Sequence, residues 1–144
     1  MKVTLKRVDD AFHFEAMGVS GVPNHIDANP EIGGANAGAR PMEMLLMGLG
    51  GCSAIDVILI LKKQRQVLED IQIEVSGERQ KIEGTEMSPF RTINVHFKFK
   101  GATISEEKAK KAIVEILEVG NIYVQVLHEV VSTVHNDDEL TSED

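Results

Sequence analysis

The sequence has little cysteine and few basic residues for its acidic content. Cys52 is the one cysteine among 144 residues, which excludes an intramolecular disulfide and any zinc site built from several cysteines. A lone cysteine fits a reducing cytoplasm, where we expect the protein to work. The chain carries 15 Lys and Arg against 23 Asp and Glu, a net charge of −8. That balance argues against a phosphate-binding surface, so we expect no nucleic-acid partner.

Long hydrophobic runs are also lacking. The first ten residues alternate in polarity and contain no apolar core of the kind that signal peptides have. The most apolar stretch without a charge, Met44–Ile55, has 12 residues, fewer than the ~20 needed to span a bilayer. We therefore expect no membrane partner. The chain has no dinucleotide fingerprint, no phosphate-binding loop and no histidine pair at helical spacing, so we expect no cofactor and no metal.

The order of polar and apolar residues predicts an α+β fold. We expect one domain over residues 1–136 and an acidic, disordered tail over 137–144. A glycine-rich loop over 32–40 should separate the first strands from the first helix. The predicted strands lie at 3–7, 12–16, 71–82, 93–99 and 130–135, and the predicted helices at 42–66 and 105–119.

The helix predicted at 42–66 is apolar on nearly every side, so both of its sides should be covered. It also contains Gly48, Gly50 and Gly51, each of which costs roughly 1 kcal/mol relative to alanine. Two explanations are open. Either another backbone approaches closely at the glycines, or the segment is two helices that meet there.

Cys52 is the only side chain of high intrinsic nucleophilicity. In a continuous helix its neighbours are apolar, apart from Asp56 one turn on, and both features disfavour a thiolate. Composition alone therefore favours a buried, structural cysteine. A reactive Cys52 requires a cation from elsewhere, or a helix that restarts just before it. Glu43 is nine residues away, ~13 Å along a helix, so it could help only from a bent helix start or from a second copy of the chain.

The segment Arg40–Val57, RPMEMLLMGLGGCSAIDV, resembles the OsmC/Ohr family of osmotically inducible and organic hydroperoxide resistance proteins. Its proline, methionine, glutamate and Gly-Gly-Cys are similar to the motif around the first cysteine in one branch of that family. Further similarity lies at Gly77–Arg79 and at Pro89–Ile93. The resemblance covers most of residues 40–135.

The resemblance implies an OsmC-like fold, with antiparallel sheets wrapped around long central helices in an intertwined homodimer. It implies that a cysteine reduces organic hydroperoxides, passing through a sulfenic acid. Cys52 matches that cysteine, and the candidate site residues are Cys52, Glu43 and Arg40, with Arg7 as the alternative activating arginine. Asn121 stands where the family has a second cysteine, so an external thiol would have to complete the cycle. The alternative is a non-catalytic homodimeric binding or structural protein with an apolar interfacial pocket.

Overall fold

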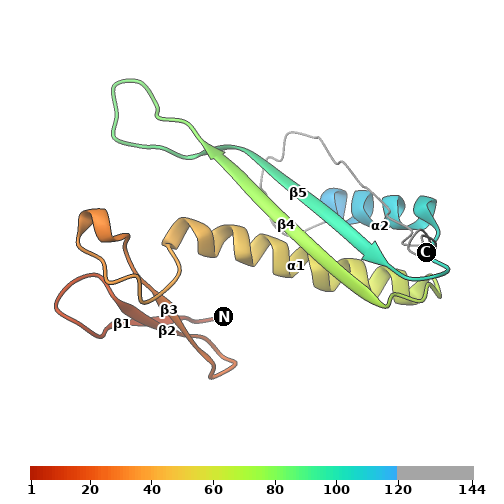
Figure 1. Cartoon of the computed structure of the whole chain (residues 1–144), viewed down its shortest axis with the longest axis horizontal. Helices are drawn as coiled ribbons and strands as arrows, with labels where there is room; N and C mark the ends of the chain where they lie inside the picture. The colour runs from red at the N-terminus through yellow and green to blue at the C-terminus, as the bar shows by residue number, and fades with distance from the viewer. Residues whose placement is uncertain (120–144) are drawn as a thin grey trace, which may run out of the picture. The chain divides into compact units, whose positions relative to one another are not determined.

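The computed structural model describes residues 1–119. The strand predicted near 130–135 and the acidic tail at 137–144 lie outside them. The chain forms two compact units, the first Met1–Met47 and the second from Gly48 onward. Figure 1 shows the elements of each unit. A single domain over residues 1–136 stays a prediction, and the two units are described separately.

The first unit contains a three-stranded antiparallel sheet, which confirms the strands expected near the N-terminus. Its strands are β1 (Thr4–Arg7), β2 (Phe14–Met17) and β3 (Pro23–Ile26), in the order β1-β2-β3. A short 3-10 helix, η1 (Pro30–Ile32), follows the sheet. The remaining residues up to Arg40 form the glycine-rich loop that the sequence predicts.

The first long helix, α1 (Pro41–Lys63), is continuous, so the alternative of two successive helices is wrong. Pro41 stands at its first position, where a missing N–H costs nothing. Within residues 1–119, α1 is the one helix long and apolar enough to cross a membrane by length and composition. Length and composition do not by themselves identify a membrane span, because the core helix of a soluble protein passes the same test.

The glycines of α1 differ from one another. Gly50 is buried, and a Cβ placed on it would lie 3.0 Å from Cγ2 of Val75 on the next strand. The close approach expected from sequence therefore exists at Gly50, although a side chain makes it rather than a backbone. At Gly48 and Gly51 a Cβ would have no atom within 4 Å. The single chain covers one side of α1, and residues on the other side are exposed. The expectation that both sides are covered therefore stays a prediction, which a second copy would have to fulfil.

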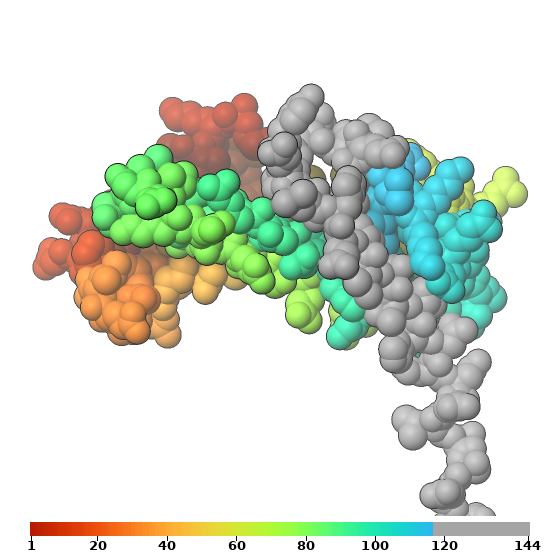
Figure 2. Space-filling model, turned by 90° about the horizontal axis from the view of Figure 1, so that it is seen from above, coloured from red at the N-terminus to blue at the C-terminus, as the bar shows by residue number. Residues whose placement is uncertain are grey.

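The second unit packs one face of a β-hairpin against two helices. Its strands β4 (Asp70–Arg79) and β5 (Phe90–Lys100) pair antiparallel, and α2 (Glu106–Val119) follows. Ser105 caps α2 as predicted, with its Oγ accepting from the Lys108 amide at 3.4 Å. In Figure 2 the blue atoms of α2 lie directly beside the turquoise end of β5. The buried core joins α1, β5 and α2 and comprises Val57, Leu61, Phe97, Phe99, Ala109, Ala112 and Ile113.

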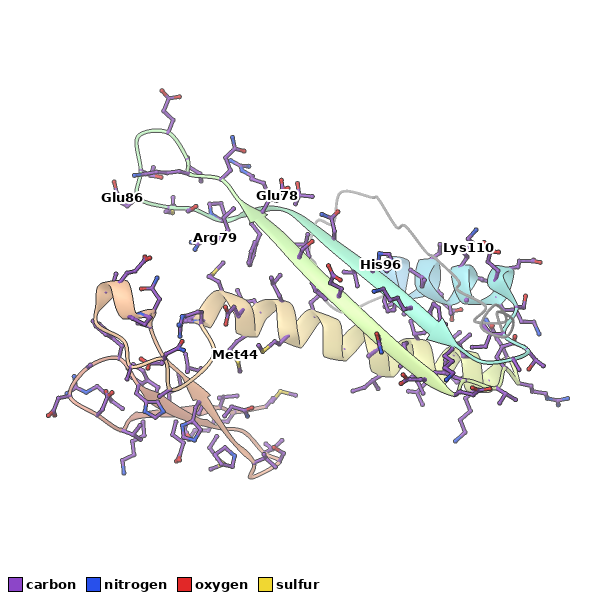
Figure 3. All side chains as sticks on the ribbon, in the orientation of Figure 1. Met44, Glu78, Arg79, Glu86, His96 and Lys110 are labelled. Atoms are coloured by element: carbon purple, nitrogen blue, oxygen red, sulfur yellow. The ribbon has the colours of Figure 1, made fainter. Side chains whose placement is uncertain are left out.

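The two short motifs that extend the family resemblance beyond α1 pair with each other across this hairpin. Gly77 lies opposite Ile93, and Arg79 lies opposite Phe90, with a register shift between Glu78 and Arg79. Figure 3 labels Glu78 and Arg79 at this end of β4. The Arg79 Nε donates to the Ser88 carbonyl at 2.6 Å. Beyond the shift the Gln80 and Ile82 amides still donate across the hairpin, to the carbonyls of Pro89 and Met87, but the regular strand β4 ends at Arg79, three residues before the predicted Ile82.

Candidate functional site

Cys52 lies near the middle of α1 and is exposed. The expectation of a buried cysteine is therefore wrong within the single chain. The physical reason is that the chain buries only one stripe of α1, which consists of Gly50, Ser53, Val57 and Leu61. The side chain of Cys52 belongs to another face, on which the neighbours at helical spacing are exposed or half-buried and none is fully buried.

The exposed face around Cys52 is apolar. Leu45 and Ile55 are each 61% exposed, and Leu59 is 50% exposed. These residues stand seven before, three after and seven after Cys52, which places them on its side of the helix. Asp56, one turn on from Cys52, is half-buried and makes no ion pair within residues 1–119. We name Leu45, Gly48, Cys52, Ile55 and Leu59 the Cys52 face.

Arg40 and Glu43 are brought together at the start of α1. The backbone N–H of Arg40 donates to Oε2 of Glu43 at 3.0 Å, which is one half of a capping box. Glu43 thus has the first-turn role that a carboxylate takes at the positive end of a helix. Glu43 and Cys52 are nine residues apart on one continuous helix, which keeps them ~13 Å apart along its axis.

The guanidinium of Arg40 binds its own loop. Its Nη1 donates to the carbonyl of Gly38 at 3.1 Å and to that of Asp27 at 3.5 Å, and its Nη2 donates to Oδ1 of Asn36. Arg7, at the end of β1, is exposed and makes no ion pair or side-chain hydrogen bond with any residue up to Val119. That Arg40 or Arg7 activates Cys52 stays a prediction.

Asp27 is a buried carboxylate that the sequence reasoning missed. Its side chain is 1% exposed and accepts hydrogen bonds from the amides of Ala28 at 2.7 Å and of Ala35 and Ala37 at 2.9 Å each. The hydrogen bond from Ala37 does most to lower the pKa of Asp27; burial opposes it, while the other two amides and the charge of His13 add to it. An aspartate before a glycine-rich loop was the only available signal.

Two histidines also meet in the first unit. Nε2 of His13 lies 2.8 Å from Nδ1 of His25, and the rings are 5.0 Å apart between centroids. Their spacing of twelve residues gave no helical signal, because the contact runs diagonally from His13, the residue before β2, to His25 of β3, whose register partner is Glu15. In the part of the chain up to Val119, no three His, Cys, Asp or Glu side chains are grouped as metal ligands are.

The fold is thus α+β with antiparallel sheets and one exposed thiol on an apolar helix face, and the comparisons with known proteins assign it. A family model described as OsmC-like protein matches residues 33–134, which is more than half of the chain. The chain therefore belongs to the OsmC-like family. The resemblance drawn from the motif around Cys52 is confirmed.

Individual proteins are similar to the chain over part of its sequence or in its fold. The chain is 41% identical over 75 residues to Protein YhfA of Escherichia coli K12, a match that spans 51% of this chain and 52% of that relative. An OsmC-like protein from Mycoplasma pneumoniae has a TM-score of 0.73 at 20% identity and covers 94% of this chain and 96% of its own. An organic hydroperoxide resistance protein from Legionella pneumophila has a TM-score of 0.62 at 18% identity over 93% and 96%. These two structures share the fold.

Proposed function

We propose that the protein is a cytoplasmic homodimer that reduces organic hydroperoxides, using Cys52 and an external thiol. The observation that carries the proposal is the exposed thiol of Cys52 at the centre of an apolar face. Such a face suits the alkyl part of an organic hydroperoxide. A structural neighbour is named as an organic hydroperoxide resistance protein, which supports the same class of substrate.

The exposed apolar residues of α1 support the homodimer. Only 22% of the residues in the most apolar stretch of α1 are buried within the chain. Fully covering one leucine or isoleucine side chain contributes about 1.5–3 kcal/mol, so the half-exposed Leu45, Ile55 and Leu59 together leave roughly 3–5 kcal/mol of burial to be gained. A second copy placed about a two-fold axis presents the same apolar surface to the first and covers both.

The chemistry requires no cofactor. The thiolate of Cys52 attacks the terminal oxygen of the hydroperoxide, so the O–O bond breaks and an S–O bond forms. The cysteine becomes a sulfenic acid, and the departing alkoxide takes a proton to become the alcohol. One external thiol then forms a mixed disulfide with Cys52 and releases water. A second external thiol restores the cysteine and leaves as the disulfide.

A positive charge near Cys52 would favour its thiolate. We assign that role to Arg40, with Arg7 as the alternative, and we assign Glu43 to orienting the arginine in the dimer. The site is proposed to include residues from both copies, because the helix holds Glu43 away from the Cys52 of its own chain. Arg7 has its charge available, whereas Arg40 would have to keep or exchange its loop partners.

The experiment is mass spectrometry of protein treated with cumene hydroperoxide in the presence of a sulfenic-acid trap. We expect the trap on Cys52, none in Cys52→Ser, and slower trapping in Arg40→Ala or Arg7→Ala, whichever removes the activating charge. An unmodified Cys52 at millimolar peroxide would contradict the proposal. We expect no covalent Cys52–Cys52 dimer on a non-reducing gel.

The non-catalytic alternative is favoured by one observation, the absence of a second cysteine from the sequence. A protein of this kind would keep the dimer and an apolar interfacial pocket without turnover. Binding of a fluorescent apolar probe by both wild type and Cys52→Ser, together with no trapped sulfenic acid in wild type, would establish this alternative.

A further inference from the structure

Asp27 is a charged side chain that is almost completely buried, so its burial has to be stabilised by other groups. Its carboxylate is 1% exposed, and the residues up to Val119 contain no other charged side chain buried to that degree. A buried carboxylate is costly unless hydrogen bonds replace its water. Three backbone amides do so here: Ala28 donates to Oδ1, and both Ala35 and Ala37 donate to Oδ2.

The loop that supplies these amides has little else to hold it. Its segment from Ala28 to Ala39 buries no large side chain, and Ile32 within it is 66% exposed. The backbone instead folds tightly on itself. A Cβ at Gly34 would overlap the carbonyl of Ala28, and Asn36 has a φ of 57°, in the left-handed region. Hydrogen bonds to Asp27 therefore take the place that apolar packing has elsewhere.

The same loop holds Arg40 and the beginning of α1. The carbonyls of Gly38 and Asp27 and the side chain of Asn36 all accept from the Arg40 guanidinium. The backbone N–H of Asp27 donates to the carbonyl of Ala39 at 3.1 Å. Arg40 in turn donates its own N–H to Glu43. The carboxylate and the two candidate site residues thus belong to one hydrogen-bonded cluster within the first unit.

We propose that Asp27 is a positioning residue, whose buried carboxylate fixes the loop from Ala28 to Ala39 and thereby sets the Arg40 guanidinium and the Glu43-capped first turn of α1. Asp27 itself touches no reacting atom. Its effect on Cys52 rests on the proposed function, in which Arg40 supplies the charge that favours the thiolate. The proposal that Asp27 fixes the loop does not depend on the proposed function.

The first test is amide hydrogen exchange of wild type, Asp27→Asn and Asp9→Asn. Asparagine keeps the shape but has a single acceptor oxygen, so in either orientation its NH₂ group faces at least one of the three donating amides and that hydrogen bond is lost. We expect exchange in 28–40 to be faster by at least about tenfold. Asp9→Asn is the matched control, because Asp9 also accepts from two backbone amides, those of Ala11 and His13, in another loop of the same unit. It should leave 28–40 unchanged. Equal exchange of 28–40 in wild type and Asp27→Asn would overturn the proposal.

The second test separates positioning from a merely structural role. The rate at which iodoacetamide alkylates Cys52 is measured against pH, with no peroxide present. Removing a negative charge alone favours the thiolate and moves the midpoint of the profile to lower pH. Misplacing Arg40 moves it to higher pH, which is the result we expect for Asp27→Asn. A midpoint that moves down or stays fixed would overturn the positioning role.

A second variant is needed in case Asp27→Asn does not fold. Asp27→Ser leaves room for water in the cradle and retains an acceptor, so it is the second variant for both measurements. The outcomes also separate this inference from the proposed function. If wild-type Cys52 does not react with peroxide, the proposed function fails, whereas amide exchange still decides whether Asp27 fixes the loop from Ala28 to Ala39.

Discussion

Replacing Gly50 by leucine tests whether the first long helix is packed against β4 as closely as its glycine indicates. Gly50 is buried, and a Cβ there would lie 3.0 Å from Cγ2 of Val75 and 4.0 Å from Cγ2 of Ile73. The first distance is shorter than ordinary van der Waals contact. A leucine would add three more carbon atoms beyond that Cβ, and neither strand residue is free to move far, since both are partly buried.

The expected magnitude is the difference between two effects. Leucine in place of glycine improves the helix propensity by about 1 kcal/mol. Overpacking typically costs ~1–3 kcal/mol, and the contact with Val75 places this substitution near the upper end. We expect Gly50→Leu to lower the free energy of unfolding by about 2 kcal/mol. For a chain of 144 residues that corresponds to a fall in Tm of roughly 4–8 °C.

The assay is thermal unfolding followed by circular dichroism at one protein concentration. Gly51→Ala is the control, because a Cβ at Gly51 has no atom of its own chain within 4 Å, so within the chain only the gain in helix propensity remains. We expect its Tm to equal or exceed that of wild type. A wild-type Tm in Gly50→Leu would refute the reasoning, and so would an equal loss in both variants.

Two further predictions concern association and pH. We expect analytical ultracentrifugation at micromolar concentration to show a homodimer; a folded monomer of 15.8 kDa would contradict this. Because the folded-state pKa of Asp27 lies below its ordinary 3.8, its contribution to stability is present above that pH and is lost as the pH falls through the lower value. The stability difference between wild type and Asp27→Asn should therefore shrink in acid, as measured by urea unfolding from pH 6 to pH 3; a constant difference would contradict the role of the carboxylate. His13 and Arg40 are the charged groups beside it.

Most of the fold followed from residue patterns because those patterns have local causes. Alternation of apolar and polar residues located β4 and β5, and Ser105 with its acidic first turn located the start of α2. The pattern could not locate the end of β4. Strand residues continue to Ile82 in composition, but the register shift at Glu78 ends the ladder sooner, and a shift of this kind has no signature in hydrophobicity.

The candidate site was less accessible to sequence reasoning. Cys52, Glu43 and Arg40 were chosen because they belong to one motif. The structure shows a hydrogen bond between Arg40 and Glu43, and the roles of all three at a catalytic site stay predictions. Asp27 was missed because its partners are backbone amides eight and ten residues away, and amides carry no residue identity. The conformation of the loop from Ala28 to Ala39 thus depends on backbone contacts between residues that are distant in sequence.

The sequence of α1 could not show which of its faces is buried, because both faces are apolar. Gly50 and Cys52 are two residues apart and hence about 200° apart around the helix, so one is buried against β4 while the other is exposed. An all-round apolar helix gives no pattern that distinguishes these faces. Gly50 marks the face that the chain itself covers, since of the three glycines in α1 it is the one whose Cβ would lie within 4 Å of another side chain. The opposite face, which carries the thiol, stays exposed in the single chain. It is the face that we propose for a second copy and a substrate, and that role would account for apolar residues that add little to the stability of the single chain.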